Sequence, residues 1–114
     1  MSTAHQHLRR CLAGDLIHGH RATWPRAMAL MHAVVLEQCP ESEAVLREVA
    51  LYDGQLQLDA SDGLPHAMSP EDALRALAVQ VLAAWNPRRH RAVIRTVHRS
   101  ARNDVVRRIA EERL

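Results

Sequence analysis

Residues 69–102, SPEDALRALAVQVLAAWNPRRHRAVIRTVHRSAR, carry the clearest helix signals in the chain. Ser69 is a typical N-cap, Pro70 suits a first turn, and two acids follow at the positive end of the helix dipole. Apolar residues then recur at steps of three and four, at Leu74, Leu77, Val81 and Trp85. This spacing predicts a helix over 70–85, with Leu77 and Val81 buried against the helix that follows.

The second half of this stretch predicts a helix over 87–102 with two different faces. Asn86 and Pro87 end the preceding helix and start this one. One face is apolar and contains Val93, Ile94, Val97 and Ala101. The opposite face contains five residues that we call the arginine row: Arg88, Arg91, Arg95, Arg99 and Arg102. These steps of three and four place all five guanidinium groups on one side of a helix.

The arginine row has no acid beside it until Asp104. Like charges at these spacings destabilise a helix by about 0.2–0.5 kcal/mol per pair, so four consecutive pairs cost about 1–2 kcal/mol. We therefore expect the row to bind an anion: the phosphate backbone of duplex nucleic acid, or an acidic surface on a protein partner. A third alternative is internal, with the acidic region 37–72 of the same chain lying against the row.

The rest of the chain predicts further helices. Apolar residues repeat at helical spacing over 3–20, 23–39 and 41–51, where Thr23 and Pro40 supply start signals. Two Asp-Gly turns in 53–68 enclose the alternating QLQLD, which predicts an ordered loop or a short strand. Such a strand would need a partner, for example its copy in a homodimer. A bend near residues 100–103 precedes a last apolar face over 105–110.

These signals predict an all-α fold: a compact bundle of about five helices in one domain over 1–114. The chain has 114 residues, of which 47% are hydrophobic, and these are enough for a core. Residues 1–85 carry six Arg and ten acids, a net charge of −4, whereas residues 86–114 carry nine Arg and three acids, a net charge of +6. All fifteen basic residues are Arg. Codon usage in a GC-rich genome accounts for the missing Lys, but not for the clustering.

The composition narrows the kind of nucleic-acid contact. Only Trp24, Trp85 and Tyr52 are aromatic, which disfavours a platform for stacking single-stranded bases. The arginine row also lacks the Asn and Gln that read adenine, so we expect no strong sequence specificity. The kind of nucleic-acid binding that remains is contact with the phosphate backbone of a duplex.

The sequence predicts no enzyme, no catalytic residue, no cofactor and no metal site. His7 and Cys11 lie one helical turn apart, but zinc sites use three or four ligands and no CxxC or HExxH is present. Cys11 or Cys39 could act as a nucleophile beside a His, and Cys39 precedes a helix start that favours a thiolate. Because cysteine is among the most buried residue types, we interpret both as packed thiols.

No signal-peptide core and no long apolar run are present, so we expect a cytoplasmic protein with reduced thiols and no membrane contact. A small lysine-free helical chain without a catalytic motif is typical of phage- or plasmid-type accessory proteins. The alternative function is therefore a protein that inhibits or modulates a host protein through protein–protein contacts.

Overall fold

The computed structural model describes residues 3–13, 23–52 and 69–114. Six helices follow one another along them: α1 (Thr3–Ala13), α2 (Trp24–Glu37), α3 (Pro40–Leu51), α4 (Pro70–Trp85), α5 (Arg91–Ser100) and α6 (Asp104–Glu112). None of these described segments forms a β-strand, and the predicted all-α fold is confirmed. The predicted loop or strand at 53–68 lies outside the described residues, as does the predicted continuation of the first helix over 14–20.

The helix starts follow the signals in the sequence. The Thr23 hydroxyl accepts a hydrogen bond from the backbone N–H of Arg26 at 3.3 Å, and the Ser69 hydroxyl accepts one from the N–H of Asp72 at 3.3 Å. Both bonds satisfy an N–H group that has no partner inside its own helix. A proline lies in the first turn of α2, α3 and α4, where its missing N–H costs nothing.

The chain forms six helices in its described part rather than five because the predicted bend is a complete break. Helix α5 ends at Ser100, and the side chain of Asn103 accepts hydrogen bonds from the N–H groups of Val105 and Val106 at 2.9 and 3.2 Å. These bonds cap a new helix, α6. The start of the fifth helix also differs from the prediction: residues 87–90 form a turn, and α5 begins at Arg91.

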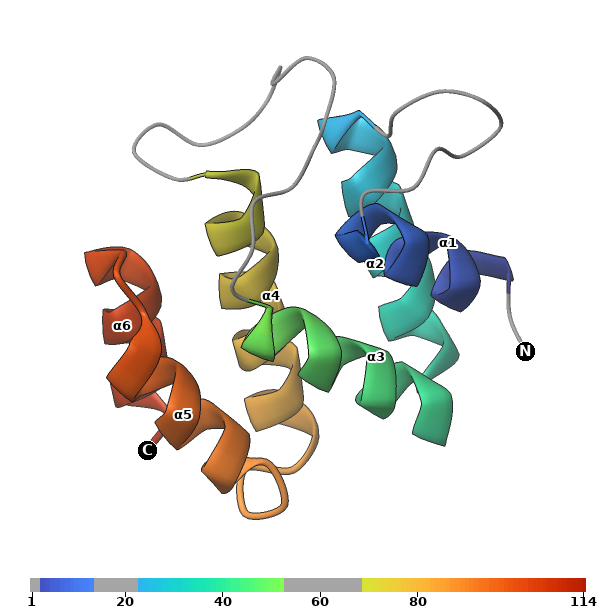
Figure 1. The fold of residues 1–114 in the computed structure, drawn as a ribbon. Coiled ribbons are helices and arrows are strands. Elements are labelled where there is room, and N and C mark those ends of the chain that lie inside the picture. Colours follow the sequence, from blue (N-terminus) through green and yellow to red (C-terminus); the bar gives the residue numbers. More distant parts are fainter. Residues whose placement is uncertain (1–2, 14–22, 53–68) are drawn as a thin grey trace.

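Helices α3 and α4 lie in the middle of the molecule, with α1 and α2 to one side and α5 and α6 to the other (Figure 1). Every helix contributes to one core. Its fully buried side chains include Leu8, Met31, Leu46, Leu74, Leu82, Ile94 and Val106. Among the described helices, none has both the length and the apolar character needed to cross a bilayer.

The buried face of α4 is rotated from the one predicted. Leu77 and Val81 are only half-buried, so the prediction that both are buried was wrong. The residues that reach the core are Leu74, Ala78 and Leu82, which repeat at steps of four, together with Ala76 and Val79. The reason is that α4 packs against α3 and α6 at once, so its buried face is centred between these neighbours. Leu77 instead lines a groove beside Trp24 and Ile109.

Candidate functional site

The arginine row is exposed throughout, but only part of it lies on a helix. Arg91, Arg95 and Arg99 lie on α5, whereas Arg88 lies in the turn before it and Arg102 lies two residues after its end. The turn forms because the Asn86 side chain accepts a hydrogen bond from the N–H of Arg89 at 3.1 Å. The helix therefore carries three members of the row at steps of four, about 6 Å apart along its axis.

The opposite face of α5 fixes the orientation of these arginines. Val93, Ile94 and Val97 are buried in the core, where α5 packs mainly against α3 and α6. The one-sided distribution of charge and apolar residues predicted from the sequence is thus present in the structure. The row faces solvent because turning the helix would expose these three aliphatic side chains.

The internal alternative places acids of region 37–72 on the arginine row, and the described residues do not show this. Glu43 of α3 does reach the start of α5, but it pairs with Arg89 at 3.4 Å and with His90 at 2.9 Å. Within 3–13, 23–52 and 69–114, no member of the row forms an ion pair. The repulsion along the row therefore remains uncompensated by the described acids.

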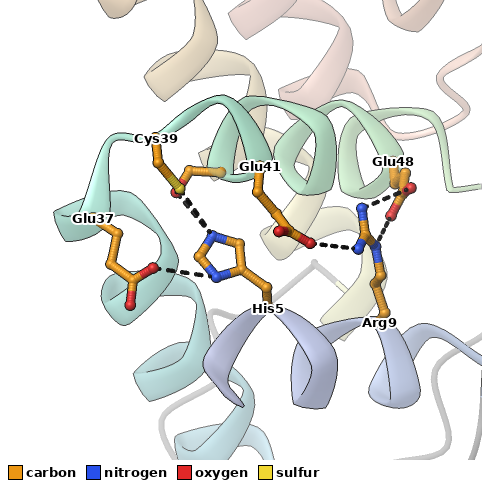
Figure 2. A network of polar contacts seen from close by, with 7 residues as sticks. His5, Arg9, Glu37, Cys39, Glu41 and Glu48 are labelled. Carbon is orange, nitrogen blue, oxygen red and sulfur yellow. Dashed lines mark hydrogen bonds and ion pairs between the residues drawn. The ribbon is translucent and has the colours of Figure 1, made fainter. Parts of the chain in front are cut away.

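A second cluster of polar side chains surrounds Cys39, which the sequence interpretation treated as a packed thiol. Cys39 is partly exposed and is the N-cap residue of α3. Its Sγ lies 3.3 Å from the Ser42 hydroxyl and 3.8 Å from His5 Nε2. The His5 ring lies between Cys39 and Glu37, and its Nδ1 is 3.3 Å from Glu37 Oε2 (Figure 2). We call Cys39, His5, Ser42 and Glu37 the thiol cluster.

The thiol cluster brings together residues of three helices, namely His5 of α1, Glu37 of α2 and Ser42 of α3. A second ion-pair network joins α1 to α3, because Arg9 donates to Glu41 at 2.8 Å and to Glu48 at 2.8 Å (Figure 2). His5 lies one turn before Arg9 on the same side of α1, so this network holds His5 against the start of α3. Gln38, in the left-handed region with φ of 45°, ends α2 and turns the chain towards Cys39.

The two cysteines have opposite electrostatic settings. Hydrogen bonds from the Ser42 hydroxyl and from the backbone N–H of Ser42 lower the pKa of the Cys39 thiol, against a smaller opposing effect of the Glu37 charge. Burial raises the pKa of the Cys11 thiol, which lies in the core. Cys11 is therefore the packed thiol that the sequence predicted.

The described residues bring one group of possible metal donors together, namely His5, Glu37 and Cys39, whose donor atoms lie within 4.8 Å of one another. The pair weighed from the sequence, His7 with Cys11, is not part of it. The two ring nitrogens of His5 face different neighbours: Nε2 is 2.9 Å from the Ser42 hydroxyl, and Nδ1 faces Glu37. No single nitrogen of His5 therefore faces both Glu37 and Cys39. Instead, the imidazole of His5 lies between the carboxylate of Glu37 and the thiol of Cys39.

Cys39 also borders an open pocket of about 390 Å³, lined by Gln38, Cys39, Pro40, Glu43 and Trp85. Cys39 is thus next to an open space large enough for a small molecule, whereas His5 and Ser42 are fully buried. Sequence reasoning could not find this site, because His5 and Cys39 are 34 positions apart. No spacing rule connects them; only the packing of α1 on α3 does.

No family model, curated protein or solved structure matches this chain.

Proposed function

We propose that this protein is a small non-enzymatic binding protein that contacts the backbone of duplex nucleic acid through the arginine row. The observation that carries the proposal is the exposure of Arg88, Arg91, Arg95, Arg99 and Arg102 without an ion-pair partner among the described residues. A row of this kind costs stability in the free protein, and a line of phosphates would neutralise it.

The surroundings of the row support an anionic partner. The exposed residues of α5 besides its arginines are Ala92 and Ser100, so the helix offers no carboxylate that would repel phosphate. Asp104, the first acid that follows, pairs with Arg107 at 3.1 Å. The elongated shape of the row suits a polyanion better than a single small anion, because its members succeed one another along the helix axis.

The proposal keeps two further expectations from the sequence: a cytoplasmic location and no cofactor. The competing partner is an acidic protein surface, as expected for an accessory protein that modulates a host protein. The two partners differ in what they require of an arginine. A phosphate accepts Lys as a point charge, whereas a carboxylate held by two parallel hydrogen bonds distinguishes Arg from Lys sharply.

Salt-dependent binding of a random-sequence duplex tests the proposal. Each neutralised phosphate contributes about −0.9 to the slope of log K against log salt, so five contacts give a slope of roughly −4 to −5. Arg95→Ala should flatten this slope by about one and weaken all duplex sequences alike. Arg95→Lys should retain most of the binding.

A matched control is Arg26→Ala, which removes an exposed arginine from α2, a helix that does not contact α5. This variant should bind duplex as the wild type does. If the wild type has no measurable affinity at about 50 mM salt, where phosphate contacts are strong, the proposal is wrong. The row then belongs to an acidic protein surface or to the acidic region 37–72 of the chain itself.

A further inference from the structure

We propose that Cys39 is an oxidation site for small hydroperoxides, at which His5 holds the thiol proton and Ser42 relays it. The site lies at the junction of α1, α2 and α3 and is separate from the arginine row. It combines a partly exposed sulfur with an imidazole that is 0% exposed and directed at that sulfur from inside the protein. A packed structural cysteine has no need of this arrangement.

The distances define a path for the proton. The Ser42 hydroxyl lies between the two ends of the path, 3.3 Å from Cys39 Sγ and 2.9 Å from His5 Nε2. The thiol can thus give its proton to the hydroxyl while the hydroxyl gives its own to the imidazole. Glu37 lies on the opposite side of the ring, with its Oε2 at 3.3 Å from Nδ1. The result is a thiolate beside an imidazolium.

A hydroperoxide uses both members of this pair. The thiolate attacks the terminal oxygen of ROOH, a sulfur–oxygen bond forms, and the oxygen–oxygen bond breaks. Sulfur is oxidised by two electrons to sulfenic acid, and the peroxide is reduced to an alcohol. The leaving RO⁻ takes the proton that His5 stored, so the imidazole returns to its neutral form. Charge and atoms balance without any further reactant.

Acyl transfer is a poorer use of the same cluster. It needs N–H groups that are free to bind the developing oxyanion. At the start of α3, the nearest backbone N–H groups are those of Glu41 and Ser42, which act on the sulfur and lower the pKa of the Cys39 thiol. Attack on a peroxide needs no such N–H groups, and the open pocket beside Pro40 and Trp85 has room for a small molecule next to Cys39.

The test exposes the folded protein to hydrogen peroxide in the presence of a cyclic 1,3-diketone, which labels sulfenic acids. Mass spectrometry of the peptides then follows Cys39 and Cys11 in the same sample. We expect Cys39 to be labelled at least about tenfold faster than Cys11, which is buried in the core. Equal rates at the two cysteines, or a rate at Cys39 no higher in the folded than in the denatured chain, would overturn the proposal.

Variants separate the relay from simple exposure. His5→Gln and Ser42→Ala should both slow labelling of Cys39 several-fold, and circular dichroism checks that each remains folded. Glu37 has a side chain that is 44% exposed, so Glu37→Gln keeps the fold. Because the Glu37 charge also raises the pKa of the Cys39 thiol, labelling by peroxide is compared with alkylation by iodoacetamide, which needs the thiolate but no proton for a leaving alkoxide. The ratio of the peroxide rate to the alkylation rate should fall in Glu37→Gln. If His5→Gln and Ser42→Ala both unfold the protein, Glu37→Gln alone tests the relay.

The matched control is Glu111→Gln, which removes an exposed carboxylate from α6, a helix that does not contact α1, α2 or α3. It should react as the wild type does. An unchanged ratio of the peroxide rate to the alkylation rate in Glu37→Gln, together with an unchanged labelling rate in a folded Ser42→Ala, would show that the relay does not act. Stoichiometric zinc in the purified wild type that is absent from Cys39→Ala would also overturn the proposal, because it would assign the cluster to a metal.

Discussion

At the residue scale, the reactivity of each cysteine thiol depends on the groups that surround its sulfur. Cys11 and Cys39 are identical side chains on helical segments, yet the first lies in the core and the second at an exposed helix start. Hydrogen-bond donors stabilise the thiolate of Cys39, whereas burial destabilises that of Cys11. Their reactivities should therefore diverge in the folded protein and converge when it unfolds.

We predict that iodoacetamide alkylates Cys39 at a lower pH than Cys11 in the folded chain. The pKa of the Cys39 thiol is lowered by hydrogen bonds from Ser42 and the backbone, which outweigh desolvation and the charge of Glu37. Alkylation rates across pH, read by peptide mass spectrometry, measure both thiols at once. In strong denaturant the two curves should coincide, and a persistent difference there would contradict the explanation.

The lowered pKa of the Cys39 thiol also determines how the stability of the folded state changes with pH. Because the folded pKa of Cys39 lies below the unfolded one, ionisation stabilises the folded state as the pH rises between the two values. The stabilisation is complete above the unfolded pKa. It is lost as the pH falls through the folded pKa. Denaturant unfolding of the wild type and Cys39→Ala at several pH values measures the difference.

At the scale of elements, side-chain caps decide where helices begin and end. Asn103 separates α5 from α6 by supplying an acceptor to two N–H groups, so the backbone changes direction within three residues. Without that acceptor these donors would lack a partner at the start of α6. The break matters for the proposed interface because it leaves Arg102 outside the helix that carries Arg95.

We expect Asn103→Ala to lower the free energy of unfolding by about 0.5–2 kcal/mol, the usual cost of losing an N-cap. Asn103→Asp should retain most of the stability, because Asp is an equally good cap. Urea unfolding followed by circular dichroism compares the three proteins. If Asp and Ala prove equally destabilising, the cap is not what starts α6.

At the scale of the whole molecule, polar contacts connect helices that are distant in sequence, and two of these contacts differ in their exposure to solvent. Glu43 of α3 binds His90, which is 0% exposed, at the start of α5. Glu48 of α3 binds Arg9 of α1 in a pair whose carboxylate is half exposed. The first contact satisfies a buried ring nitrogen, whereas the second is screened by solvent. Their contributions to stability should therefore differ.

Glu43→Ala should destabilise the fold by about 1–3 kcal/mol, because it leaves a buried nitrogen of His90 without its partner. Glu48→Ala should cost less than about 1 kcal/mol, as exposed ion pairs do. Thermal and urea unfolding of both variants provide the comparison. Equal losses would indicate that water reaches His90 once Glu43 is removed.

The sequence by itself determined the all-α fold class and most helix starts, because these depend on contacts within a few residues. Thr23, Pro40 and Ser69 are where their local signals placed them. The exposure of the arginine row was also predictable, since Val93, Ile94 and Val97 occupy the opposite face and only one face of α5 can be buried.

Only the tertiary structure decided which residues meet across the core. The packing of α4 between two helices rotated its buried face towards Leu74 and Leu82, away from Leu77. The approach of α1 to α3 placed His5 beside Cys39 and Ser42. Periodicity reports the faces of a single helix, but it contains no information on which other helix covers a face. That choice depends on the shape and volume of all the packed side chains together.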